Sequence, residues 1–230
     1  QLIKGLMNDA TCERWLALSP VMQELAEASP SEFLKALETN LANTEPLVFN
    51  LFTESSSGMM GGGFVHANLL WALEILAWAP NRILRVSRIL AELNKAPIES
   101  NWGNNPSSSL LNIYRGWKPQ TSASVDMRNK AMAALADTHP DTAFDLSMGI
   151  LHQGHDMASP SSRPSWRDDD TGCPDTVSNV EYHAVLKHAA ELAFGLVGNN
   201  SDKAVELLER YDIFDDTYFA RVLEIVQSCL

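Results

Sequence analysis

The stretch HANLLWALEILAW, residues 66–78, decides the fold class of this chain. Apolar side chains occupy almost every position around its helical turns, which is typical of a helix that is buried on all sides. Three polar residues interrupt it, namely His66, Asn68 and Glu74. With these interruptions the stretch is too short and too polar to cross a bilayer. We therefore expect this helix to lie at the centre of a core.

The next stretch, RILRVSRILAELNK at residues 82–95, is predicted to form an amphipathic helix. Its apolar residues recur at helical spacing, as at Ile83, Val86 and Leu90. Only an Ala-Pro-Asn connection separates it from the first helix, and Asn81 is placed to cap its start. Two helices joined so closely predict an antiparallel hairpin.

Further helices are predicted wherever apolar periodicity lies between Ser-Pro, Asn, Gly or Asp boundaries. Their ranges are 10–18, 20–28, 31–42, 47–52, 107–117, 124–138, 141–152, 178–197, 202–211 and 216–229. The predicted fold is all-α, with stacked antiparallel helical hairpins in a degenerate HEAT- or TPR-like alpha-solenoid. A globular helical domain is the alternative, because no strict repeat motif is present.

The chain is expected to divide into four parts. These are N-terminal helices over residues 1–54, central hairpins over 63–152, a long polar loop over 153–176 and C-terminal helices over 177–230. The first residues, QLIKGLMN, already have helical character. We therefore expect the N-terminal helices to continue from an upstream part of a longer protein.

The chain is acidic, with a formal net charge of −12, and 45% of its residues are hydrophobic. This hydrophobic content is sufficient for a sizeable core. The charge argues against nucleic-acid and anionic-membrane partners, because both surfaces favour clustered Lys and Arg. Cys12, Cys173 and Cys229 lie far apart and form no CxxC pair, so no disulfide framework is expected. We expect a cytoplasmic segment that holds no cofactor.

The polar segment NWGNNPSSSLLNIYRGWKPQT, residues 101–121, is the first candidate binding site. It mixes amide donors with aromatic faces, which suits it to hold a peptide or another loop. The candidate residues are Trp102, Asn104, Asn105, Trp117 and Gln120. The structural alternative is that Asn and Ser residues cap the helix that starts near residue 107, while both tryptophans anchor the connection to the core.

The segment HQGHDMASPSSRPSWRDDD, residues 152–170, is the second candidate binding site. Its candidate residues are His155, Asp156, Arg163, Trp166 and Arg167. The two arginines can donate forked hydrogen bonds to carboxylates, which include Asp156, Asp168 or those of a ligand. Internal pairing that holds the long loop in place is the alternative.

A candidate metal site consists of His152, His155 and Asp156. An HD pair in an all-helical protein resembles the HD-type metal-dependent phosphohydrolases, and His66 and His183 are further candidate ligands. In that superfamily the HD pair lies on a helix, whereas here Gly154 precedes His155 at a predicted helix end. A C-cap at Gly154, with His152 beside the last carbonyls, is the structural alternative.

Arg82, Arg85 and Arg88 recur at a spacing of three residues on the second helix. Such a stripe is usually a solvated face that is paired with Glu and Asp. Contact with an acidic partner is the alternative.

Four landmarks occur in a fixed order, namely LLWALEILAWAP at 69–80, NRILRVSRILAELNK at 81–95, NWGNNPSSSLLNIYRGWKPQTSA at 101–123 and GHDMASPSSRPSWRD at 154–168. Their order and spacing resemble a helical region of large bacterial NTPase-linked proteins, including the antiviral STAND-type ATPases. The likeness covers mainly residues 63–211, and the P-loop module of these ATPases is not in this chain.

The resemblance implies a helical sensor or scaffold segment with no catalytic residue of its own. Its implied partners are a protein, such as a phage protein, and the remainder of the parent chain. We therefore expect a non-catalytic, protein-binding segment of a bacterial defence protein. A metal-dependent phosphohydrolase that uses His152, His155 and Asp156 is the alternative function.

Overall fold

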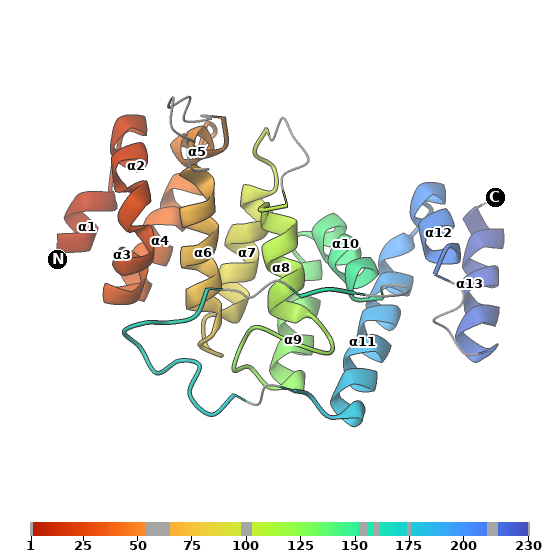
Figure 1. The fold of residues 1–230 in the computed structure, drawn as a ribbon. Coiled ribbons are helices and arrows are strands. Elements are labelled where there is room, and N and C mark those ends of the chain that lie inside the picture. The colour runs from red at the N-terminus through yellow and green to blue at the C-terminus, as the bar shows by residue number, and fades with distance from the viewer. Residues whose placement is uncertain are drawn as a thin grey trace.

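The computed structural model describes residues 2–53, 65–97, 103–151, 156–158, 162–173, 176–210 and 216–229. Within these ranges every regular element is a helix, so the fold is all-α (Figure 1). The N-terminal part contains α1 (Leu2–Met7), α2 (Cys12–Leu18), η1 (Ser19–Val21), α3 (Met22–Ala28), α4 (Pro30–Leu41), η2 (Leu47–Phe49) and α5 (Asn50–Thr53). The remainder contains α6 (Val65–Ala77), α7 (Ile83–Leu93), α8 (Pro106–Tyr114), α9 (Val125–Ala136), α10 (Pro140–Ile150), α11 (Asn179–Val197), α12 (Ser201–Leu208) and α13 (Asp216–Cys229).

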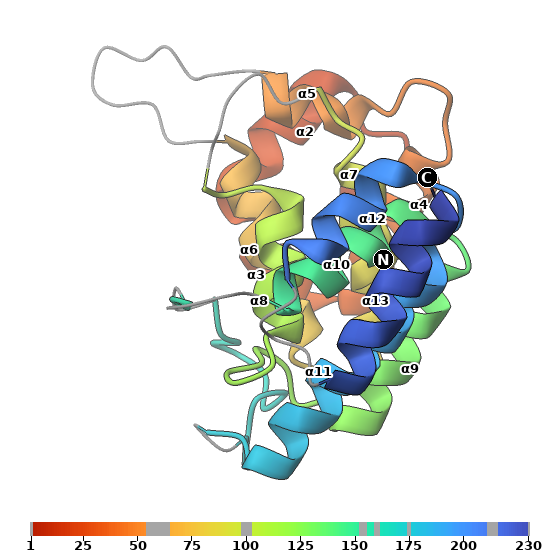
Figure 2. The same cartoon turned by 90° about the vertical axis from the view of Figure 1, so that its right-hand side faces the viewer.

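The helices form an elongated array that follows the order of the chain from the N-terminus to the C-terminus (Figure 1). Apart from the short helix α5, the main contacts from α3 to α11 are between helices that lie one or two places apart along the chain. One row thus contains α3, α6, α8 and α10, and a second row contains α4, α7, α9 and α11. The turned view shows α3, α6 and α8 on one side and α4 and α9 on the other (Figure 2). The HEAT- or TPR-like repeat character of this array stays a prediction.

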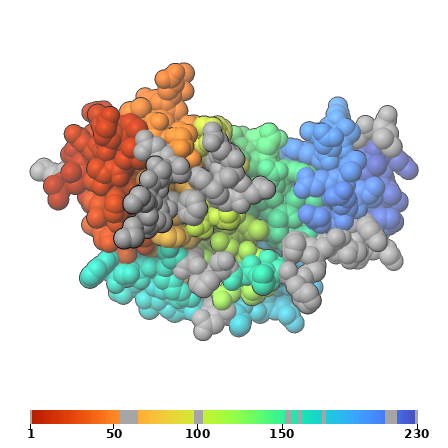
Figure 3. Space-filling model, turned by 45° about the horizontal axis from the view of Figure 1, so that its top comes forward, coloured from red at the N-terminus to blue at the C-terminus, as the bar shows by residue number. Residues whose placement is uncertain are grey.

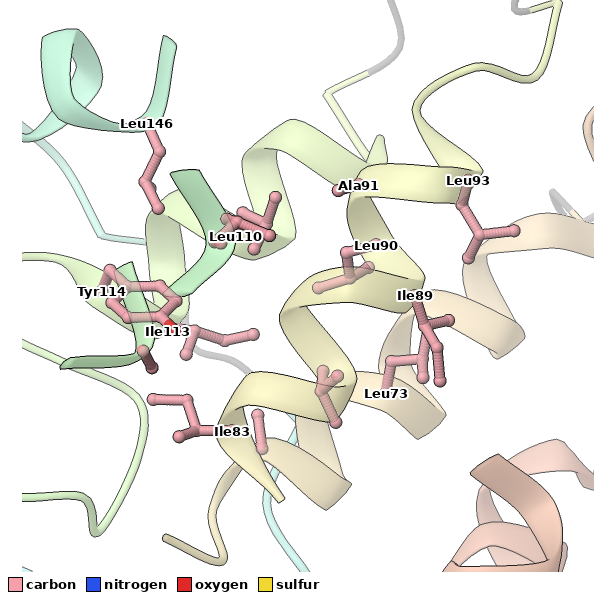
Figure 4. Packing of buried hydrophobic residues seen from close by; sticks show 14 of the residues in the cluster. Leu73, Ile83, Ile89, Leu90, Ala91, Leu93, Leu110, Ile113, Tyr114 and Leu146 are labelled. Atoms are coloured by element: carbon pink, nitrogen blue, oxygen red, sulfur yellow. The ribbon is translucent and has the colours of Figure 1, made fainter. Parts of the chain in front are cut away.

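The core runs through the middle of this array, and α6 lies within it. Leu69, Leu70, Leu73 and Leu76 of α6 are all buried. Figure 4 shows the packing of α6, α7 and α8, with Leu73 beside Ile89. Within the described ranges no helix has both the length and the apolarity that a bilayer span requires. The segment at residues 66–78 is therefore a core helix, as its composition predicts.

Several helix starts are capped by the residues that the sequence provides. The Asn105 side chain accepts a hydrogen bond from the backbone N–H of Ser108 at 2.8 Å. At α11, Ser178 and Glu181 form a complete capping box. Asn200 accepts hydrogen bonds from two backbone N–H groups at the start of α12. Such caps satisfy backbone donors that the first helical turn leaves without partners.

Two local expectations, and one part of a structural alternative, were wrong. Arg82, which has no capping side-chain hydrogen bond, occupies the position before α7, so Asn81 does not cap this helix. The helix predicted over 107–117 ends at Tyr114, because Arg115 takes a non-helical conformation with φ −46° and ψ 127°. Trp117 therefore follows the helix. It is 39% exposed, so it does not anchor the connection in the core.

The segment SSSGMMGGG, residues 55–63, lies outside the described residues.

A long irregular segment between α10 and α11, residues 156–173, is called the strap below; its residues 156–158 and 162–173 are described. Its residues 162–173 lie along the lower edge of the array, where residues 165 and 166 contact α3 of the N-terminal part (Figure 1). In the space-filling view its atoms lie beside those of the N-terminal helices (Figure 3). The strap thus brings together parts of the chain that are far apart in sequence.

Candidate binding site on the strap

The far end of the strap is held by a buried carboxylate at the end of α3. Glu27 is only 4% exposed. Its carboxylate accepts hydrogen bonds from the backbone N–H of Ser165 at 3.0 Å and of Trp166 at 2.7 Å. Arg167 donates from Nη1 to the backbone carbonyl of Glu27 at 3.2 Å. A buried charge is tolerated only when donors surround it, and the strap provides these donors.

A second buried carboxylate, Glu74 of α6, holds the middle of the strap. It accepts hydrogen bonds from the Ser109 hydroxyl at 2.7 Å and from the backbone N–H of Ser162 at 3.4 Å. Burial raises the pKa of Glu74 above its ordinary value, although both hydrogen bonds act in the opposite direction. Trp78 donates from Nε1 to the backbone carbonyl of Ser162 at 3.1 Å. Ser162 is therefore fixed through both its N–H and its carbonyl.

The two strap arginines pair within the strap. Arg163 Nη1 lies 3.3 Å from an Asp170 carboxylate oxygen, and its guanidinium lies 4.6 Å from the centre of the Trp78 ring. Arg167 donates from Nε to Asp169 at 3.2 Å. The carboxylates they contact are thus Asp169 and Asp170, and not the predicted partners Asp156 or Asp168. Internal pairing, the alternative for this loop, matches these contacts.

The return leg of the strap, residues 169–173, is held by residues that lie next to the central helices. Asp169 forms an ion pair with Arg82, next to the start of α7. The hydroxyl of Ser122 donates to the Asp169 backbone carbonyl and accepts a hydrogen bond from the Cys173 thiol, whose sulfur lies 2.9 Å away. Backbone and side chain of Asp169 are therefore both engaged.

The first described residue of the strap joins the two candidate loops. Asp156 forms an ion pair with Arg115 and accepts a hydrogen bond from Trp117 Nε1 at 2.9 Å. Arg115 is 5% exposed, and its guanidinium lies 5.9 Å from the centre of the Trp117 ring. Together with Gly116 and Tyr182 these residues line a pocket of about 120 Å³. The loop after α8 and the strap therefore meet at this point.

The other described candidates of the first loop have structural contacts. The backbone carbonyl of Asn104 lies 3.1 Å from His66 Nε2 and accepts a hydrogen bond from it in the tautomer that protonates this nitrogen. Asn105 caps α8, and the backbone N–H of Gln120 donates to the carbonyls of Asn112 and Ile113 at the end of the same helix. Gln120 is buried. Trp102 lies outside the described residues.

The candidate metal site is only partly within the structure. His152, Gly154 and His155 lie outside the described residues, and Asp156 is engaged by Arg115 and Trp117. In the described part of the chain, no three His, Cys, Asp or Glu side chains are grouped so that they could hold a metal ion. His66 is buried and stacks on Phe52 with ring centres 5.2 Å apart. Burial lowers the pKa of His66, which favours a neutral ring.

The strap presents one large aromatic side chain to solvent. Trp166 is 79% exposed, although its backbone N–H is held by Glu27. Met157, near the other end of the strap, is 87% exposed. Most other large apolar side chains that the structure describes are buried or partly buried in the core. The strap thus combines a backbone that is held at Trp166 with a tryptophan side chain that is exposed.

Two residues that hold the strap, Glu27 and Glu74, are not among the candidate site residues predicted from the sequence. Glu74 gives one signal, since it is a charged residue in the most apolar helix of the chain. Glu27 gives none, because it resembles the other acidic residues of α3. Neither a scan of protein-family models nor searches of curated proteins and of solved structures found a match to this chain.

Proposed function

We propose that this chain is a protein-binding helical scaffold that presents Trp166 on a fixed strap to a protein partner. The observation that supports this function is the contrast between the Trp166 backbone, held by buried Glu27, and its exposed side chain. Tryptophan is enriched among the residues that dominate interface energies. A backbone that is already ordered loses less conformational entropy on binding than a flexible loop does.

The landmark resemblance extends this proposal to the parent protein. The scaffold would act as the sensor segment of a larger bacterial defence protein and would bind a foreign protein such as one from a phage. The formal net charge of −12 supports a protein partner over nucleic acid, because phosphates would be repelled. The α-helical array supplies a rigid frame that keeps the strap in one position.

Site-specific photocrosslinking tests this proposal in the intact parent protein. A benzophenone amino acid replaces Trp166 in one variant and Trp71 in a control variant, since Trp71 is a partly exposed tryptophan on α6. Both variants are irradiated in phage-infected and uninfected cells. We expect a discrete crosslinked protein at position 166 and none at position 71.

A Trp166→Ala variant separates loss of binding from loss of folding. Because the side chain is exposed, the substitution should change the free energy of unfolding by less than about 0.5 kcal/mol. It should nevertheless abolish binding of the partner that the benzophenone variant identifies. Equal crosslinking at positions 166 and 71, or unchanged binding by Trp166→Ala, would refute the proposed function.

A further inference from the structure

The three arginines of the α7 stripe have different partners. Arg82 pairs with Asp169 of the strap. Arg85 forms a two-pronged pair with Glu38 of α4, with both N···O distances at 2.8 Å. Arg88 has no carboxylate within ion-pair distance among the described residues, and its Nη2 donates only a long hydrogen bond of 3.5 Å to the carbonyl of Ala134. Arg88 is exposed to solvent.

Arg88 lines a groove of about 300 Å³. The apolar lining comes from Leu41 and Ala42 at the end of α4 and from Ile89 of α7. His139, in the turn between α9 and α10, also lines the groove. The volume equals the share of roughly ten water molecules in the liquid, so a short aliphatic chain fits.

The two carboxylates that line this groove already have cationic or hydrogen-bonding partners. Glu38 is paired with Arg85. Glu92 contacts Lys95 and His139, each at 2.7 Å. Burial raises the pKa of Glu92, but the contacts with Lys95 and His139 lower it by more, so the pKa lies below its ordinary value. Arg88 is thus the charged residue of the groove that has no counterion among the described residues.

We propose that this groove binds an aliphatic carboxylate, with its chain on Leu41, Ala42 and Ile89 and its carboxylate on the guanidinium of Arg88. A planar guanidinium matches the two oxygens of a carboxylate through paired hydrogen bonds. The adjacent apolar surface removes the chain from water. The site is on the second row of helices and does not depend on Trp166 or on the proposed function.

The probe is octanoate, titrated into the full chain and followed by the methyl NMR signals of isoleucine and leucine. Octylamine has a chain of the same length with the opposite charge, and acetyl-glycyl-leucine has a carboxylate at a peptide C-terminus. We expect octanoate to shift the Ile89 and Leu41 methyl signals saturably, in the millimolar range, and octylamine to leave them unchanged. Binding of the peptide without binding of octanoate would overturn the assignment to a free aliphatic acid.

Two variants test the role of Arg88. Arg88→Gln should weaken octanoate binding about tenfold, as expected for loss of a charged hydrogen-bonding partner. Arg88→Lys should lose less, because the charge remains. Lys130→Gln is the matched control, since it removes one positive charge from an exposed ion pair on α9. Equal binding by wild type and Arg88→Gln, or equal shifts with octylamine, would refute the site.

Discussion

Glu74 illustrates how one side chain in a helix can organise a distant loop. It lies among leucines on α6, where a carboxylate is costly unless donors reach it. The Ser109 hydroxyl and the Ser162 backbone N–H supply such donors. They come from α8 and from the strap, so the position of Glu74 sets where both segments meet α6. The contacts of Glu74 are structural, and its burial raises its pKa above the ordinary value.

Replacing Glu74 with Gln should change how stability depends on pH. Burial raises the folded-state pKa of Glu74 above its unfolded value. Between these two values the folded state therefore binds more protons than the unfolded state does. The contribution of Glu74 to the free energy of unfolding decreases as pH rises through this window. The free energy of unfolding of wild type, relative to Glu74→Gln, should fall from about pH 4 upward and then level off. Urea titrations across this pH range measure it, and a difference that does not vary with pH would contradict the assignment.

The strap is the element on which the candidate site depends, and its order comes from contacts outside itself. It has no helix or strand in its described residues. Its far end is held by Glu27, its middle by Trp78 and Glu74, and its return leg by Arg82 and Ser122. Irregular segments satisfy their backbone groups with side chains or water, and here buried side chains supply several of these partners.

Asp169→Ala should loosen the return leg of the strap. The substitution removes the carboxylate partner of Arg82, whose side chain is only 11% exposed. We expect a loss of about 1–3 kcal/mol in the free energy of unfolding, less than for a fully buried pair because some solvent reaches both groups. Asp168→Ala is the control, because Asp168 is exposed. Chemical denaturation of both variants measures the difference, and equal stabilities would show that the ion pair contributes nothing.

At the scale of the whole molecule, the strap adds long-range contacts to an array whose helices otherwise contact mainly their near neighbours in the chain. Ser165 and Trp166 are 138 and 139 residues from Glu27 in sequence. An array stabilised by contacts between neighbours can lose its terminal helices locally. The strap therefore links the N-terminal helices to the centre by a second route.

Glu27→Gln should weaken this link specifically. The substitution removes the charge that accepts the N–H groups of Ser165 and Trp166, at a cost of about 1–3 kcal/mol. Amide hydrogen exchange should become faster in the strap and in α3, with little change in α11. Glu24→Gln, at an exposed position on the same helix, is the control. Unchanged exchange in α3 would show that the strap does not stabilise the N-terminal helices.

Helix positions could be predicted from the sequence, because periodicity, caps and breakers act over a few residues. The apolar stretch of α6, the cap at Asn105 and the stop at Gly198 are examples of such local signals. The candidate site could be predicted only in part: Trp166 and the strap arginines were identified, whereas Glu27 was not. Its partners lie far along the chain, and no local pattern encodes which distant amides approach a buried carboxylate. The exposure of Trp166 follows from the contacts that hold the strap. The lack of a carboxylate partner at Arg88 among the described residues follows from helix packing. Both depend on neighbours that are remote in sequence.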